Sequence, residues 1–192
     1  LGNPTNPTGV LHPAAEIGRL VRPGRIVVVD EAFMDFVPGE PESVLAGDLD
    51  GVLVTRSLTK LWGIAGLRAG FVAGDQTLIG ELARHQEPWA VSTPALDAMV
   101  AIASGQADRV AARILDEVAT ERAFLVDALR AAGFPVAGEP RTPFVLVDVS
   151  SLGVANPPEA LAAEGFAVRR CDTFPGLGPD WIRVSVPSEP IS

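Results

Sequence analysis

The sequence predicts an α/β fold, in which a mostly parallel sheet with helices on both faces is followed by a small α+β domain. Two continuous apolar runs rich in β-branched residues, 25–30 and 51–57, are typical of strands that are buried on both faces. A third run, 69–74, predicts another strand of the same kind. From Pro94 to about Ala132, apolar residues recur at helical spacing, which predicts one or two long helices.

The remaining elements are shorter. Strands are expected at 142–149, 166–169 and 181–186, and a short helix is expected at 157–164. These four elements form the predicted α+β unit. Near the N-terminus, 13–20 predicts one more short helix, which ends at a Pro-Gly turn.

Composition excludes several classes of function. Fifteen basic and twenty-four acidic side chains give a net charge of −9, which opposes non-specific binding to nucleic acid or to an anionic membrane. No apolar run is long enough for a membrane span, and the residues before the first expected strand lack the pattern of a signal peptide, so neither is expected. The single cysteine, Cys171, cannot form an internal disulfide, so a cytoplasmic location is expected. Because the sequence starts at Leu1 in a polar, turn-forming run, we expect a fragment of a longer chain.

The basic residues single out one position. Fourteen of the fifteen are arginine, and the only lysine is Lys60. Arginine and lysine solubilise a surface equally well, but only lysine carries an amine that can lose its proton and attack an aldehyde. Lys60 is therefore a candidate for chemistry.

Four motifs occur in order along the chain. They are Asn6-Pro7-Thr8-Gly9, Asp30-Glu31-Ala32-Phe33, Ser57-Leu58-Thr59-Lys60 with Gly66-Leu67-Arg68-Ala69-Gly70, and Trp181-Ile182-Arg183-Val184-Ser185-Val186. Asp30 and Lys60 follow the ends of expected strands, where open α/β sheets bind ligands. At these spacings, the motifs resemble those of the class I/II aminotransferase family, which are fold-type I enzymes dependent on pyridoxal 5′-phosphate (PLP).

The resemblance implies a large-domain part of that fold, PLP as the cofactor and a role for each motif residue. Lys60 would bind the cofactor aldehyde and carry a proton at the substrate α-carbon. Asp30 would pair with the pyridine nitrogen, and Asn6 would donate to the ring 3′-oxygen. Ser57 and Arg68 would hold the cofactor phosphate.

The resemblance also implies substrate contacts, with one departure from the family pattern. Arg183 would meet a substrate carboxylate, and Arg169 would bind the phosphate of a small phosphorylated amino-acid substrate. Phe33 stands at a cofactor-binding position where many relatives carry a tyrosine, so the hydrogen bond from that hydroxyl is missing here. The role of Arg170, the neighbour of Arg169, stays open.

Local features resemble the branch that contains histidinol-phosphate aminotransferase and threonine-phosphate decarboxylase. These features are the segments 57–62, 86–92 and 168–177. They favour decarboxylation of threonine phosphate, a step of cobalamin biosynthesis, over transamination of histidinol phosphate. Transamination of an ordinary amino acid is a third possibility. The orientation of the bond that breaks decides between these reactions.

The resemblance assigns domains and partners as well. Residues 1–93 would be the second half of the large PLP-binding domain, 94–132 bridging helices, and 133–192 a truncated small C-terminal domain. A homodimer is implied. The first half of the family's chain is absent, so we expect the isolated chain to bind the cofactor poorly and to need that missing N-terminal half as a partner.

Other classes of function are less well supported. An inactive remnant of this fold could act as a scaffold or interaction domain, which a cofactor titration would reveal. A nucleotide-binding Rossmann module is disfavoured because no G-x-G-x-x-G follows the first strand. Metal catalysis is disfavoured because His12 and His85 lie far apart and Cys171 has no companion at ligand spacing.

Overall fold

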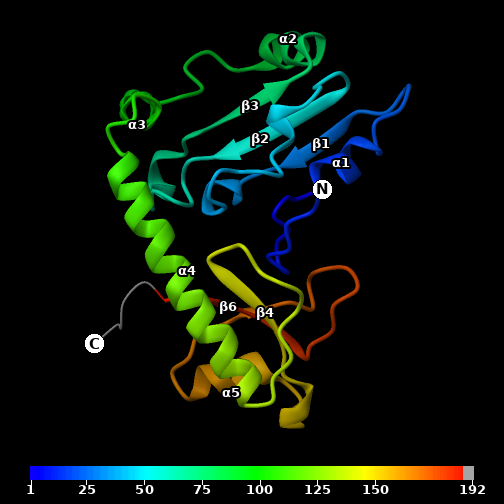
Figure 1. Cartoon of the computed structure of the whole chain (residues 1–192), viewed down its shortest axis with the longest axis vertical. Helices are drawn as coiled ribbons and strands as arrows, with labels where there is room; N and C mark the ends of the chain where they lie inside the picture. Colours follow the sequence, from blue (N-terminus) through cyan, green and yellow to red (C-terminus); the bar gives the residue numbers. More distant parts are fainter. Residues whose placement is uncertain (188–192) are drawn as a thin grey trace. The chain divides into compact units, whose positions relative to one another are not determined.

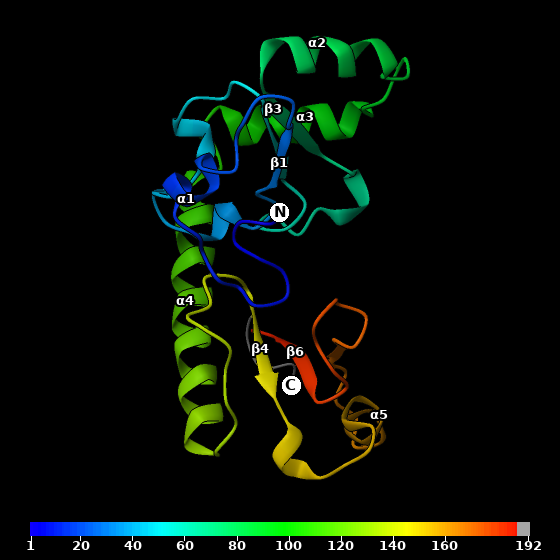
Figure 2. The ribbon, with the colours of Figure 1, turned by 90° about the vertical axis from the view of Figure 1, so that its right-hand side faces the viewer.

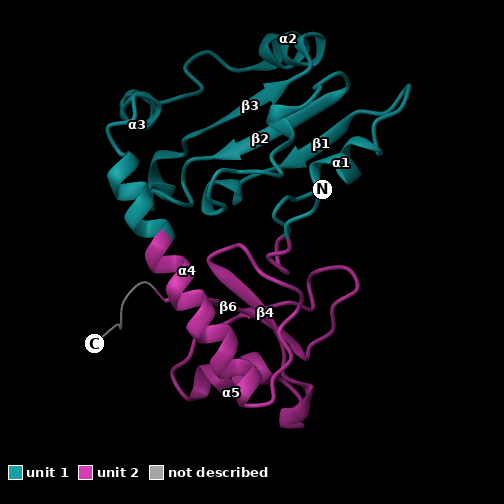
Figure 3. Ribbon diagram, viewed as in Figure 1, with its two compact units in different colours: residues 1–5, 11–115 teal, residues 6–10, 116–192 magenta. Residues whose placement is uncertain are grey.

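The computed structural model describes residues 1–187 and divides the chain into two compact units (Figure 3). Unit 1 comprises residues 1–5 and 11–115, and unit 2 comprises residues 6–10 together with the chain from residue 116 onward. The last residues of the expected small domain, 188–192, lie outside the described part. The three-part domain assignment made from the sequence stays a prediction.

Unit 1 contains a three-stranded sheet in the order β1-β2-β3 (Figure 1). Its strands are β1 (Val27–Asp30), β2 (Val52–Ser57) and β3 (Gly70–Gly74). β1 is parallel to β2, as expected, but β3 is antiparallel to β2, so a third parallel strand was the wrong prediction. The connection between β2 and β3, residues 58–69, contains the 3₁₀ turn η3 (Ala65–Leu67) and no α-helix. Parallel neighbours are usually joined by a crossover that contains a helix.

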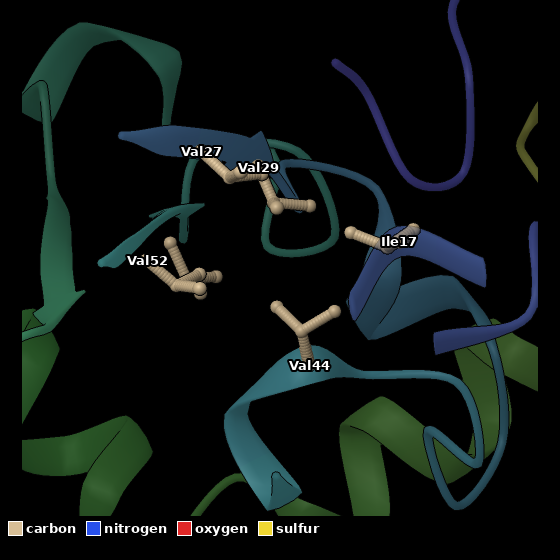
Figure 4. Packing of buried hydrophobic residues seen from close by; sticks show 6 residues of the cluster. Ile17, Val27, Val29, Val44 and Val52 are labelled. Carbon is tan, nitrogen blue, oxygen red and sulfur yellow. The ribbon is translucent and has the colours of Figure 1, made fainter. Parts of the chain in front are cut away.

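The core of unit 1 lies on one face of β1. Val27 and Val29 are buried there against Ile17, Val44 and Val52 (Figure 4). Val28, which points to the opposite face, is 47% exposed. The expectation that the 25–30 strand is buried on both faces is therefore wrong for this structure, because burial alternates along β1.

The helices of unit 1 are short. They are α1 (Ala14–Gly18), α2 (Gln76–His85) and α3 (Thr93–Ala103), with 3₁₀ turns η1 (Met34–Phe36) and η2 (Val44–Ala46) (Figure 2). The sequence analysis did not predict α2. Its signal was Asp75, the N-cap, whose Oδ1 accepts hydrogen bonds from the backbone N–H groups of Thr77 and Leu78.

The long helical region forms two helices, α3 and α4 (Asp108–Ala131). Gly105 separates them with a φ of +74°, a left-handed conformation that favours glycine. α4 is the longest helix and begins in unit 1 and ends in unit 2. Among residues 1–187, no helix combines the length and the apolar character that a membrane span requires.

Unit 2 contains an antiparallel sheet in the order β4-β6-β5. Its elements are β4 (Phe144–Asp148), η4 (Ser150–Leu152), α5 (Pro157–Ala163), β5 (Arg169–Arg170) and β6 (Trp181–Ser185). Val145, Val147 and Ile182 pack against Val126 of α4.

The expected strand 166–169 is largely wrong, because β5 begins only at Arg169. The backbone N–H of Phe166 donates to the carbonyl of Leu161 at 2.9 Å, and Gly165 has a φ of +86°. This hydrogen bond and the left-handed glycine cap the C-terminal end of α5. The segment after the helix is therefore used as a cap instead of a strand.

Candidate active site

The lysine predicted to react lies at the carboxyl edge of the unit 1 sheet. Ser57 is the last residue of β2, and Lys60 follows it after a tight turn. The Lys60 side chain is exposed, and its Nζ lies over the Phe33 ring, 5.8 Å from the ring centroid. The two motifs that contain Phe33 and Lys60 therefore meet in space, although the sequence separates them.

Asp30 occupies the same edge of the sheet. It is the last residue of β1, and its register partner on the parallel strand β2 is Thr55. Its Oδ1 accepts a hydrogen bond from the Thr55 hydroxyl at 3.1 Å and another from the backbone N–H of Ala32 at 3.1 Å. These two donors hold the exposed carboxylate in one orientation.

A cavity of about 350 Å³ lies beside the end of β2. Ser57, Thr59 and Arg68 all contribute to its lining. The hydroxyl oxygens of Ser57 and Thr59 are 2.8 Å apart and hydrogen-bonded, so two hydroxyls and one guanidinium gather at one opening. Gly70 lines the cavity too, and a Cβ there would lie 2.5 Å from the carbonyl oxygen of Arg56.

Two larger cavities in unit 1 hold none of the candidate residues. The one between α1 and η2 has a volume of about 590 Å³ and is lined largely by apolar side chains such as Ile17 and Val44. The other, of about 570 Å³, lies beside the turn at 22–25. The smaller cavity at Ser57 is the one that combines polar donors with the candidate residues, and we therefore take it as part of the candidate site.

Unit 2 contains the second group of candidate residues. Arg169 of β5 and Arg183 of β6 are register partners on adjacent antiparallel strands, so their side chains start from neighbouring positions. Arg183 donates a hydrogen bond to Oδ1 of Asn6 at 2.6 Å, and its guanidinium lies 4.6 Å from the Phe144 ring centroid. Burial lowers the pKa of Arg183, Cys171 opposes this effect, and the charge of Arg169 adds to it.

The structure therefore gathers the eight candidates into two groups. Unit 1 holds Asp30, Phe33, Ser57, Lys60 and Arg68, and unit 2 holds Asn6, Arg169 and Arg183. Arg170, whose role was open, forms an exposed ion pair with Asp172, with its Nε 2.7 Å from Oδ1. The functional roles of the eight candidate residues remain proposals.

The sequence analysis missed two features of this region. Thr59 is buried and shares the cavity with Ser57, but it was treated only as a member of the motif. Arg56, in the middle of β2, is also buried and pairs with acidic side chains of the segment after β1. The available signal for Arg56 was a charged residue inside an apolar strand, which requires a partner when buried.

Comparisons with known proteins find relatives over nearly the whole length of this chain. A histidinol-phosphate aminotransferase of Mycobacterium tuberculosis is 43% identical over 98% of this chain, which covers 51% of that protein. A threonine-phosphate decarboxylase of a Sinorhizobium species is 36% identical over 96% of this chain and is covered to 53%. The chain therefore spans about half the length of these relatives.

The comparison with solved structures supports the fold. The crystal structure of histidinol-phosphate aminotransferase from Sinorhizobium meliloti, in complex with pyridoxal-5′-phosphate, matches with a TM-score of 0.78. The match covers 97% of this chain and 51% of that one at 22% identity, which supports the fold alone. The family model for aminotransferase class I and II matches residues 1–190. The chain belongs to the class I and II aminotransferase family.

Proposed function

We propose that the complete protein, meaning the longer chain that carries this sequence, is a PLP-dependent aminotransferase with histidinol phosphate as its substrate. The observation that supports this substrate best is the 43% identity to the mycobacterial histidinol-phosphate aminotransferase over 98% of the chain. The decarboxylase that the sequence analysis favoured has a relative at 36% identity. Decarboxylation of threonine phosphate is therefore the second candidate.

The residues of unit 1 fit PLP. The cavity at the end of β2 offers the hydroxyls of Ser57 and Thr59 and the guanidinium of Arg68, which suit a phosphate group. The Asp30 carboxylate, oriented by two hydrogen bonds, suits a protonated ring nitrogen. Phe33 offers a ring face and no hydroxyl, so it cannot donate a hydrogen bond to the cofactor.

Lys60 is the proposed catalytic residue. PLP, when bound, supplies an electron sink for charge that develops at the substrate α-carbon. Lys60 would bind the cofactor aldehyde through its amine and, once the substrate had taken that place, would accept the proton of the substrate α-carbon and return it. The exposure of Lys60 leaves its Nζ accessible for both roles.

The arginines of unit 2 are the proposed anion-binding residues. Two guanidinium groups on opposite positions of β5 and β6 suit a phosphate or a carboxylate. In transamination, the phosphate of the amine substrate and a carboxylate of the keto-acid acceptor would occupy this place in turn. Asn6 holds Arg183 through its side-chain oxygen, so we propose Asn6 as the residue that orients Arg183 in addition to its implied contact with the cofactor.

The division into domains is a further proposal on the same basis. We propose that residues 1–93 belong to the large domain, 94–132 to bridging helices and 133–192 to the small domain. The remaining half of the relatives' length would come from the rest of the chain, the missing N-terminal half. The homodimer and the cytoplasmic location stay predictions.

The test of the reaction uses the complete protein with PLP. Histidinol phosphate and 2-oxoglutarate should yield glutamate, whereas threonine phosphate should release little carbon dioxide. Release of carbon dioxide at the higher rate would instead support the second candidate. Lys60→Ala should abolish the visible absorbance of the bound cofactor and the activity. A retained band would remove Lys60 from its role.

The test of the substrate site compares two neighbouring arginines. Arg169→Gln should raise KM for histidinol phosphate at least tenfold, since a charge-assisted phosphate contact is lost. Arg170→Gln is the matched control, because Arg170 pairs with Asp172 and should change KM little. Equal effects of the two substitutions would contradict the proposed role of Arg169.

A further inference from the structure

Arg56 lies at the centre of a largely buried ionic network that also contains Glu31, Asp35 and Ser43, with Glu40 at its exposed edge. Its Nη2 lies 3.0 Å from a carboxylate oxygen of Glu31, and its Nη1 donates to Oδ1 of Asp35 at 2.7 Å. Its Nη1 also lies 3.0 Å from Glu40, and its Nη2 donates to the Ser43 hydroxyl at 3.1 Å. The Arg56 side chain is only 6% exposed, so water competes little for these contacts.

Glu31 closes this network onto the backbone. Its side chain is fully buried, and its two carboxylate oxygens accept hydrogen bonds from the Ser43 hydroxyl and from the backbone N–H of Val44, each at 2.8 Å. The segment from Glu31 to Val44 is thereby folded around one guanidinium. A carboxylate without that guanidinium would be a buried, unpaired charge.

The network borders three of the candidate residues without containing any of them. Asp30 directly precedes Glu31, and Ser57 directly follows Arg56. Phe33 lies between Glu31 and Asp35, the two carboxylates that Arg56 binds. The Phe33 ring in turn lies under Lys60 Nζ. Arg56 on β2 therefore fixes the turn that presents an aromatic ring to the lysine.

We propose that Arg56 is a positioning residue for Lys60: by binding the carboxylates on both sides of Phe33, it holds the Phe33 ring under the lysine amine. This role rests on the proposed function of Lys60, and it assigns Phe33 a task that needs no hydroxyl. A ring face attracts a cation, so a fixed ring restricts where the amine can lie.

The single lysine of the chain permits a direct test in the absence of cofactor. Protein labelled with ¹³C at the lysine ε-carbon gives one lysine signal, from Lys60. Protons above an aromatic ring resonate upfield because of its ring current, so the Lys60 ε-protons should lie upfield of free lysine. Phe33→Leu should return them to the free value. Arg56→Gln should move them most of the way to that value.

Two further variants keep the test informative. Because Arg56→Gln leaves Glu31 buried without its ion pair, the protein could unfold. Asp35→Asn is milder, because it keeps the ion pair of Arg56 with Glu31 and removes the charge of only one carboxylate near Phe33. This variant should shift the Lys60 ε-proton signal in the same direction by a smaller amount. Arg130→Gln is the matched control, because Arg130 belongs to an exposed ion pair in unit 2 and should leave the signal unchanged.

The outcomes separate this inference from the proposed function. In the complete enzyme, Arg56→Gln should lower kcat more than it raises KM, because Lys60 stays present but is badly placed. An upfield signal in wild type that survives Arg56→Gln and Asp35→Asn in folded protein would overturn the positioning role. A wild-type signal at the free-lysine value would overturn it too. Neither result would affect the cofactor absorbance that tests Lys60 itself.

Discussion

Asn6 and Arg183 form a hydrogen bond of 2.6 Å although 177 residues separate them in the sequence. Backbone contacts join residues 6–10 to the later part of unit 2. The N–H of Arg141 donates to the carbonyl of Gly9 at 2.7 Å, and Val10 forms an isolated β-bridge with Pro140. A Cβ at Gly9 would lie 2.6 Å from the Thr142 hydroxyl oxygen, so this close contact favours glycine. The segment therefore presents Asn6 to Arg183 in the middle of β6.

Asn6→Ala should destabilise the protein by about 0.5–1 kcal/mol, because Arg183 loses an acceptor at a partly exposed site. Urea denaturation, followed by circular dichroism, measures this difference. Asn6→Asp keeps an acceptor and adds a negative charge, so its stability should equal or exceed that of wild type. If Asn6→Ala were as stable as wild type while Asn6→Asp were less stable, the hydrogen bond would contribute nothing.

The sequence predicted the elements whose local pattern is strong. β1, β2 and β4 follow from continuous apolar runs, and α4 follows from its long periodic pattern. Strand direction was not predictable in the same way, because β3 carries the same local pattern whether it pairs parallel or antiparallel. The connection before β3 contains no α-helix, which favours the antiparallel pair.

The sequence predicted only those residues of the candidate site that belong to a recognised family motif. The family resemblance identifies Lys60 and Arg68 and implies that Arg183 lies near Arg169, but the strand register that makes these two arginines partners on β5 and β6 is visible only in the structure. The partners of Arg56 were also inaccessible. They come from a turn that the sequence marks merely as irregular, and burial of the charge becomes visible only once the turn is folded over β2.

Arg141→Gln should stabilise the protein. Burial lowers the pKa of Arg122, and repulsion from Arg141 lowers it further, which indicates that the two guanidinium groups disfavour one another. Both line a cavity of about 350 Å³ in unit 2, and in the described part of the chain neither forms an ion pair with a carboxylate. Because Arg141 is exposed, the gain should be only about 0.2–0.5 kcal/mol.

The salt dependence of thermal unfolding checks this prediction. The gain should shrink in about 1 M salt, where charges on the surface are screened. Arg130→Gln provides the comparison, because Arg130 lines the same cavity but donates to Glu139 at 3.2 Å. Arg130→Gln should therefore destabilise the protein slightly. A salt-independent gain for Arg141→Gln would point to a cause other than repulsion.

Two glycines of unit 1 should respond to alanine in opposite ways. At Gly74, the end of β3, a Cβ would lie 2.2 Å from the carbonyl oxygen of Val52, so the strands must separate. Gly74→Ala should cost about 2–3 kcal/mol. Gly80, in the exposed part of α2, has nothing within 4 Å of such a Cβ, so Gly80→Ala should stabilise by about 0.5–1 kcal/mol. Urea denaturation of both variants measures the change in the free energy of unfolding. A change of the same sign in both variants would contradict the close approach of β2 and β3.

The pH dependence of stability should change when Asp35 is replaced by asparagine. Burial raises the pKa of Asp35 above its usual 3.8, the positive charge of Arg56 opposes this shift, and Glu40 adds to it. Between 3.8 and the raised value, the folded state binds more protons than the unfolded state. The stability that Asp35 contributes through protonation is therefore complete below the unfolded pKa and is lost as pH rises through the folded pKa.

Asp35→Asn removes this dependence. The stability of wild type relative to the variant should therefore fall as pH rises from about 4 to about 7. Asp75→Asn is the control of opposite sign, because hydrogen bonds from the backbone N–H groups of Leu78 and Gly51 lower the pKa of Asp75. Its contribution is present above the unfolded pKa and is lost as pH falls through the folded pKa. Urea denaturation from about pH 2 to about pH 7 measures both differences, and a wild-type advantage over Asp35→Asn that grows with pH would show that the Arg56 charge outweighs burial at Asp35.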